Sequence, residues 1–333
     1  SSCAAASVRP TEDHPMAVTT YSQQAGGSGG SDATRLAALI ARNRRMDRVF
    51  MVGGISVLLI AALMLISLIL GLVVQGASSV DVEFLTNFPS RRPESAGILA
   101  AWVGTTAVMV VTALLALPLG VAAGMYLEEY APNNWVTDLI EINVTNLAGV
   151  PSIIYGLLAL GLFLFTFGMG QWVLVAGLVL ALLILPVVIV STRESFRSIP
   201  REVREAAHAL GADDWQTVSR YLMPAAWPGI LTGLIVGLSR AIGETAPVIT
   251  IGALTFIAFL PAAPITSAFP YLSFEWLTAP FTVMPIQMFN WVSRPQSEFH
   301  DLAAGAGLVL LAMTLTMNAA AIFIRYRLRR RGR

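Results

Sequence analysis

The stretch "REAAHALGADDWQTVSRYLMP", residues 204–224, is charged and polar, although strongly apolar segments lie on both sides of it. Just before it, Pro200 suits the first turn of a helix, because the N–H that proline lacks would have no partner there. Val203, Ala207 and Leu210 then fall on one face of a short helix. The stretch is therefore predicted to open with a helix that has one small apolar side.

The second half of the stretch is typical of a turn followed by another helix. Gly211 can adopt the left-handed conformation that ends helices, and Asp213 with Gln216 three residues later resembles a capping box. Pro224 would close the unit. The segment 200–224 is thus predicted to be a helical hairpin, whose second helix has an apolar face formed by Trp215, Val218 and Leu222.

The rest of the chain is far more apolar than a soluble protein. Of its 333 residues, 56% are hydrophobic and 12% are charged, and the mean hydropathy is +0.70. Soluble proteins carry about 25% charged residues. Runs of roughly 20 apolar residues can cross a bilayer as helices. We predict an all-α membrane protein with six transmembrane helices, at about 49–74, 98–126, 142–167, 172–192, 227–256 and 302–324.

The distribution of arginine predicts the orientation in the membrane. Cytoplasmic loops carry an excess of positive charge. Placing the N-terminus inside puts three arginine clusters on that side, at 35–48, 193–220 and 325–333. The outer loops then hold only Arg91, Arg92 and Arg294. Both termini and the hairpin are therefore expected in the cytoplasm.

The spans divide the chain into segments of different character. Residues 1–31 are rich in Ala, Ser, Gly and Gln and are expected to be disordered. Residues 32–48 have the spacing of an amphipathic helix that lies on the membrane surface. The transmembrane domain would cover 49–326, and 327–333 would form a basic cytoplasmic tail. The loop 257–301, rich in proline and aromatic residues, shows no helical pattern.

Small residues and prolines mark special positions within the spans. Gly229, Gly233 and Gly237 form a doubled GxxxG ridge, which lets a neighbouring helix approach closely. This pattern indicates a packing face rather than chemistry. Prolines inside membrane helices are tolerated and are expected to produce kinks, here at Pro118, Pro151 and Pro186.

The residue content argues against an enzyme. All 21 basic residues are arginine, so the chain lacks the lysine that a Walker A loop needs. The histidines are scattered and do not have the spacing of a zinc site, at His14, His208 and His300. ATP hydrolysis and metal catalysis are therefore not expected in this chain.

A polar hairpin between two membrane spans has several interpretations. A small helical pair is suited to fit a groove on a soluble partner, and a plain solvated loop is equally consistent with the residues. A DNA-binding helix-turn-helix is disfavoured, because only a few residues separate the hairpin from the membrane spans. The residues alone leave the first two interpretations open.

The hairpin resembles the EAA motif of ABC importer permeases, EAA-x3-G-x9-I-x-L-P. In that family the loop is the coupling helix that docks into the ATPase subunit. The matching positions are Glu205, Ala206, Ala207, Gly211 and Pro224. Tyr221 replaces the usual isoleucine and Met223 the usual leucine, and both keep an apolar body.

Other segments extend the resemblance over about 97–326. The stretches "YLEEYAP", "NLAGVPSIIYGLLALGLF", "LTGLIVGLSRAIGETAPVI" and "PIQMFNWVSRPQSEFH" are similar to permeases of ABC phosphate importers, and more to the PstA type than to the sister PstC type. The resemblance implies a type I ABC importer permease fold in the bacterial inner membrane. It also implies a PstC-like permease, two PstB-like ATPases and a PstS-like phosphate-binding protein as partners. ATP and Mg²⁺ would be bound by the ATPases, and this chain would hold no cofactor.

Two alternatives to a phosphate importer remain at this point. A permease subunit for another oxyanion shares almost every feature above. A stand-alone channel or secondary transporter would belong to a different class, but it would not need a docking hairpin.

Two charges lie within the predicted fifth span. Arg240 and Glu244 are four residues apart, on one face of a helix. A charge at the middle of the bilayer costs about 2.5–3.5 kcal/mol on insertion scales, so such residues face a partner or a polar pathway. A guanidinium matches phosphate oxygens, and Glu244 could position Arg240 along that pathway. The alternative is a buried ion pair with a purely structural role.

Overall fold

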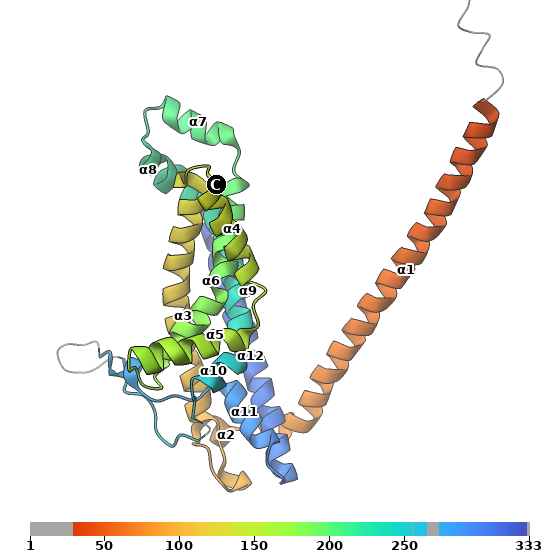
Figure 1. Ribbon diagram of the computed structural model, residues 1–333. Coiled ribbons are helices and arrows are strands. Elements are labelled where there is room, and N and C mark those ends of the chain that lie inside the picture. The colour runs from red at the N-terminus through yellow and green to blue at the C-terminus, as the bar shows by residue number, and fades with distance from the viewer. Residues whose placement is uncertain (1–28, 255, 265–272, 332–333) are drawn as a thin grey trace, which may run out of the picture. The chain divides into compact units, whose positions relative to one another are not determined.

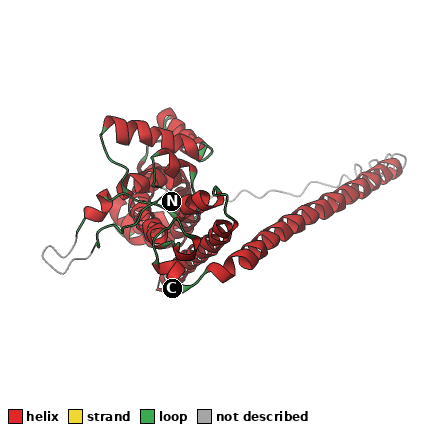
Figure 2. Cartoon of the chain, turned by 90° about the horizontal axis from the view of Figure 1, so that it is seen from below, coloured by secondary structure: helices red, strands yellow, loops and turns green. Residues whose placement is uncertain are grey.

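The structure, a computed structural model, describes residues 29–254, 256–264 and 273–331 (Figure 1). These residues are helices joined by loops, and they contain no strand (Figure 2). Their only isolated β-bridge joins Trp172 and Pro280. The predicted all-α class is therefore confirmed. The chain divides into two compact units, residues 1–68 and residues 69–333.

The first long helix, α1, covers Gly29–Gly76 as one continuous element. The expected boundary between an interfacial helix at 32–48 and a first span at 49 is therefore not a break in the helix. From Val49 to Ser79 this region is long and apolar enough to cross a membrane. Residues 1–28 of the expected disordered tail lie outside the described residues, whereas residues 29–31 belong to α1. That residues 32–48 follow the membrane surface stays a prediction.

Two long helices, α3 (Leu99–Met125) and α6 (Val173–Arg197), form the centre of the second unit. They run in the same direction, because Gly120 faces Val188 and Gly124 faces Thr192, with both numbers rising together. Buried aliphatic side chains from both helices fill the main core. Pro118 and Pro186 lie inside these helices, as expected.

Two further helices complete the bundle, α9 (Met223–Ala241) and α12 (Ser297–Arg331). Gly229 of α9 lies against Ser195 of α6, and Gly237 lies against Ile184, so these two helices are antiparallel. Contacts of α12 with α9 join Asn318 to Ser239 and Arg325 to Thr232, which is again an antiparallel arrangement. The bundle therefore has a hairpin end, where α3, α6 and α12 finish and α9 starts, and an opposite end.

The third predicted span, 142–167, is wrong as a single helix. It is instead a pair, α4 (Trp135–Leu147) and α5 (Ser152–Ala159) with a π-helical continuation over Leu160–Thr166, and the two parts meet at 105°. Proline cannot donate the next helical hydrogen bond, and Pro151 stands at the break. The carbonyl of Leu147, which proline leaves without its usual helical partner, accepts hydrogen bonds from the Tyr155 hydroxyl at 2.8 Å and from the Val150 N–H at 3.2 Å.

The bent pair still carries the chain across the bundle. Because α3 and α6 run in the same direction, the residues between them must return to the end where α3 began. The described residues therefore contain five helices long enough to span a membrane, and six spans if the bent pair counts as one.

The fifth predicted span, 227–256, is wrong at both of its ends. A continuous helical run extends from Asp214 to Ala241 and begins within the hairpin. It consists of α8 (Asp214–Gln216), a π-helical turn over Thr217–Leu222, and α9. After Ala241 the chain turns, and a short helix, α10, covers Ala246–Thr250.

The opposite end of the bundle is built from short elements. They are the 3₁₀ turns Ala77–Ser79, Pro93–Ser95 and Glu275–Thr278 and the helices α2 (Val82–Thr86) and α11 (Met284–Val292). The expectation of no helix within 257–301 is therefore wrong, since α11 lies there and α12 begins at Ser297. Phe84, Trp291 and Phe299 form a buried aromatic cluster between these elements.

The glycine ridge of α9 packs as the GxxxG pattern predicts. A Cβ atom added at Gly233 would lie 1.7 Å from Ser191 Oγ and 2.2 Å from its Cβ. A Cβ at Gly229 would lie 2.2 Å from Ser195 Oγ. The ridge therefore sets the distance between α6 and α9.

We predict that Gly233→Ala destabilises the bundle, because the added methyl group overlaps Ser191 and overpacking costs about 1–3 kcal/mol. The control is Gly161→Ala, since a Cβ at Gly161 meets nothing within 4 Å. Thermal unfolding of the purified chain in detergent, followed by circular dichroism, should show a lower Tm for the first variant only. An unchanged or raised Tm for Gly233→Ala would contradict this account of the ridge.

Candidate functional site

The hairpin begins with α7 (Arg201–Ala209), which ends in a glycine turn. Gly211 has φ +84°, which confirms the left-handed conformation predicted for it. Its N–H donates to the His208 carbonyl at 2.9 Å, and the Ala212 N–H donates to the Ala207 carbonyl at 3.1 Å. These two bonds form a Schellman motif. The chain reverses within a few residues because only glycine adopts this conformation without strain.

The second limb of the hairpin starts at the predicted capping box. The Gln216 N–H donates to Asp213 Oδ1 at 2.6 Å, and the Asp213 N–H donates back to Gln216 Oε1. The prediction that Pro224 closes the hairpin is wrong, because Pro224 lies in the first turn of α9 and the helix continues through it. The π-helical turn just before it widens the helix where proline removes a hydrogen bond.

The apolar residues of the hairpin do not form a single patch. Ala207 is buried, and Val218 and Leu222 are buried in a cluster with residues of α6. Leu210 and Trp215, in contrast, are 81% and 62% exposed. The inner set anchors the hairpin on the bundle, whereas the outer set faces away from it.

The positions that match the EAA motif are likewise divided between buried and exposed residues. Glu205 and Ala206 are exposed on α7, while Ala207 is buried beneath them. Gly211 forms the turn beside exposed Leu210. An exposed surface on the hairpin is thus formed by Glu205, Ala206, Leu210 and Trp215, which we call the outer face.

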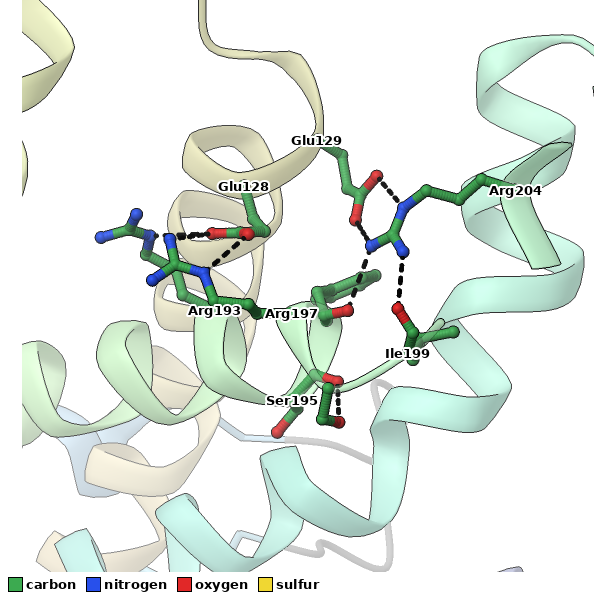
Figure 3. Close-up of polar contacts among 9 residues, drawn as sticks. Glu128, Glu129, Arg193, Ser195, Arg197, Ile199 and Arg204 are labelled. Atoms are coloured by element: carbon green, nitrogen blue, oxygen red, sulfur yellow. Dashed lines mark hydrogen bonds and ion pairs between the residues drawn. The ribbon is translucent and has the colours of Figure 1, made fainter. Parts of the chain in front are cut away.

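A network of ion pairs surrounds the end of α3, and one of these pairs fixes the hairpin to the bundle, as Figure 3 shows. Arg204 of α7 donates from Nε and Nη2 to the two carboxylate oxygens of Glu129, at 3.2 and 2.5 Å. The same guanidinium donates to the backbone carbonyls of Ile199 at 2.9 Å and Phe196 at 3.0 Å. The hydrogen bonds to Glu129 raise the pKa of Arg204 above its ordinary value. The side chain stays charged at every physiological pH.

The neighbouring carboxylate, Glu128, pairs with α6 instead. Arg197 donates to both of its oxygens, at 3.1 and 3.0 Å, and Arg193 lies 3.4 Å from it. Arg193 also reaches Glu141 of α4, at 2.7 Å. Glu128 and Glu129 both belong to the π-helical turn Tyr126–Tyr130 that ends α3. This network was not predicted from the sequence, although the adjacent acidic residues of "YLEEYAP" and the arginines of 193–204 were its visible signal.

The intramembrane pair is formed, but not on a regular helix. Arg240 Nε lies 3.3 Å from Glu244 Oε1, which confirms the predicted contact. Arg240 is in the last turn of α9, whereas Glu244 lies beyond the end of that helix, so the expected shared helix face is wrong. Their side chains are 40% and 18% exposed. The roles of both residues stay a prediction.

An open groove lies along one face of α9. Its volume is about 710 Å³, and α4, α6 and α9 line it. Thr232 and Val236 line this groove, and Arg240 follows them at helical spacing, so all three lie on one face of α9. Hydroxyl groups of Thr145 and Ser191 add polar atoms to the wall. The wall also carries the carboxylate of Glu194 and is otherwise mainly apolar, and Arg240 lies beyond the residues that line the groove.

Known proteins resemble this chain along most of its length. The profile of a family described as "Binding-protein-dependent transport system inner membrane component" matches residues 116–333. "Probable ABC transporter permease protein YqgI" of Bacillus subtilis (strain 168) is 33% identical, covering 80% of this chain and 90% of its own length. "Phosphate transport system permease protein PstA 1" of Mycobacterium tuberculosis (strain H37Rv) is 33% identical, over 71% of this chain and 72% of that protein. The PstA protein of Yersinia pestis is 27% identical over 84% and 90%.

A solved structure shares the fold. A chain from inward-facing structures of the MetNI methionine ABC transporter matches with a TM-score of 0.52 at 16% identity. The match covers 68% of this chain and 93% of that one. The predicted ABC importer type I permease fold is confirmed.

Proposed function

Because this chain belongs to the family of inner-membrane components of binding-protein-dependent transport systems, we propose that it is a permease subunit of an ATP-driven importer of inorganic phosphate. The observation that carries the proposal is the helical hairpin held at one end of a membrane bundle, with Leu210 and Trp215 exposed on its outer face. Exposed large apolar residues on a small rigid unit favour a docking surface.

The hairpin would couple this chain to an ATPase subunit. Glu205 and Ala206 lie on the outer face, and Gly211 sets the turn that presents Leu210. ATP binding would close the ATPase dimer and draw its docked hairpins together. The helices would then rock between inward-open and outward-open arrangements. ATP and Mg²⁺ would be bound in the ATPases, so this chain would carry neither.

Phosphate is favoured as the substrate by two independent observations. Several relatives, among them those of Mycobacterium tuberculosis and Yersinia pestis, are named phosphate transport system permease proteins of the PstA type. Arg240 is a partly exposed guanidinium in the last turn of a membrane helix, and its fork of donors matches the oxygens of an anion. Glu244 would hold Arg240 in place and weaken its grip, so that the anion is released.

The complete importer would need further subunits. The groove along α4, α6 and α9 is open in this chain. We infer that a PstC-like permease covers it, so that the pathway lies between the two permeases. Two PstB-like ATPases would dock on the hairpins, and a PstS-like protein would deliver phosphate at the opposite end. All of these would assemble in the bacterial inner membrane, with both termini of this chain in the cytoplasm.

We predict that a reporter enzyme fused after Gly211 or after Arg333 reads cytoplasmic, whereas one fused near Phe281 reads external. The reason is that Phe281 lies towards the opposite end of the bundle from the hairpin, and the arginine clusters favour the hairpin end as the inner side. Paired alkaline phosphatase and fluorescent protein fusions would measure this. A cytoplasmic signal near Phe281 is incompatible with the proposed orientation.

We predict that labelled phosphate enters proteoliposomes only when this chain, the second permease, the ATPases, the binding protein and ATP are all present. Excess unlabelled phosphate should abolish the signal, and excess sulfate or molybdate should leave it unchanged. Competition by one of those anions would favour an importer of another oxyanion. Uptake without the ATPases would favour a stand-alone channel or secondary transporter.

We predict that Arg240→Gln abolishes phosphate uptake while the complex still assembles. Arg240→Lys should transport poorly, because lysine keeps the charge but loses the fork. Glu244→Gln should have a smaller effect if Glu244 only positions Arg240. The measurement is labelled uptake, with membrane levels of the assembled complex recorded in parallel.

A purely structural pair would give a different pattern. If the pair becomes enclosed in the assembled complex, each single change would leave one charge there without its partner, and assembly would fail. Replacing Arg240 and Glu244 together by apolar residues would then restore assembly and uptake. Recovered uptake in that double variant would rule out the pathway role.

A further inference from the structure

The geometry points to Arg204 as a positioning residue: we propose that its contact with Glu129 is a joint through which movement of the hairpin reaches α3. The inference rests on the proposed function, since it requires a soluble ATPase that moves the hairpin. It differs from the docking role of the outer face, because Arg204 and Glu129 lie on the inner side.

Arg204 connects three parts of the structure with one guanidinium (Figure 3). It belongs to α7, it binds Glu129 at the end of α3, and it caps the carbonyls of Phe196 and Ile199 at the end of α6. The side chains of Arg204 and Glu129 are only 22% and 11% exposed. A fork-to-carboxylate contact that is shielded from water is among the stronger and more directional contacts in proteins.

This contact is also special among the side chains of α7. Within the described residues, no other α7 side chain forms a hydrogen bond or ion pair with the membrane helices. The His208 ring lies 3.1 Å from the Ala212 carbonyl, inside the hairpin, and Ala207 is buried but has no polar side-chain atom. Among the side chains of α7 that the structure describes, Arg204 is therefore the only one with a polar contact to the end of α3.

The second limb is connected in another way. It continues without a break from Asp214 into α9, so any movement of the hairpin acts on α9 directly. The end of α3 has no such covalent link to the hairpin and meets it through Glu129. Without the contact between Arg204 and Glu129, a movement of the hairpin would still move α9 but would no longer move the end of α3. ATP would then be hydrolysed without a complete change of the pathway.

The test compares two arginines in the complete reconstituted importer. Arg204→Gln removes the joint. Arg197→Gln is the matched control, because Arg197 pairs with the adjacent Glu128 but does not contact the hairpin. In proteoliposomes, Arg204→Gln should lower phosphate uptake per ATP hydrolysed by about tenfold, the effect of losing one strong charge-assisted contact. Arg197→Gln should leave that ratio unchanged.

A second variant keeps the test decisive if Arg204→Gln fails to assemble. Glu129→Gln removes the carboxylate but leaves Arg204 free to cap Phe196 and Ile199, so folding should be preserved. Glu129→Gln should lower phosphate uptake per ATP hydrolysed as Arg204→Gln does. The double variant, Arg204→Gln with Glu129→Gln, should not lower it further than either single variant. Arg204→Lys should recover part of the ratio.

The outcomes separate the joint from the proposed function. A normal ratio in assembled Glu129→Gln would overturn the joint and leave the importer intact. A reduced amount of complex with a normal ratio would assign the contact a structural role only, which also overturns the proposal. Failure of the wild-type complex to take up phosphate would instead overturn the proposed function.

Discussion

The close parallel packing of α3 and α6 is the constraint on which the rest of the bundle depends. Gly120 lies against Val188 and Gly177 lies against Val111, so the two backbones approach where a larger residue would not fit. Since both helices point the same way, the chain between them must cross back. Because α9 packs antiparallel to α6, the residues that join these two helices all lie at one end of the bundle. The bent α4–α5 pair and the hairpin are both consequences of these directions.

Features that depend on a few neighbouring residues could be predicted from the sequence. Gly211, Asp213 and Gln216 determine the turn and the helix cap through hydrogen bonds that span three to five residues. Such a short pattern can be recognised directly in the amino-acid sequence. The glycine ridge of α9 could be predicted for a similar reason, because small residues at a spacing of four always share a helix face. The family motif was recognised over the same hairpin.

Features that depend on distant residues could not be predicted. Glu128 is 69 positions from Arg197, and Glu129 is 75 positions from Arg204. No pattern of neighbouring residues predicts which arginine binds which glutamate. Hydropathy placed the end of the fifth span at residue 256, although the helix ends at Ala241. The residues that follow are as apolar as a helix in lipid, so composition does not show that the chain turns there. The break at Pro151 was expected as a kink, but its 105° angle reflects how α5 packs against α10.

The continuity of the hairpin with α9 has a mechanical consequence. Asp214–Ala241 is 28 residues long, and at 1.5 Å per residue it forms a rod of roughly 42 Å. A lever of this length converts a small rotation into a useful displacement: a tilt of about 10° around its middle moves each end by about 4 Å, as follows from that rise per residue. Arg240 lies near the far end of the lever. A modest swing at the hairpin would therefore shift the guanidinium by more than the length of a hydrogen bond.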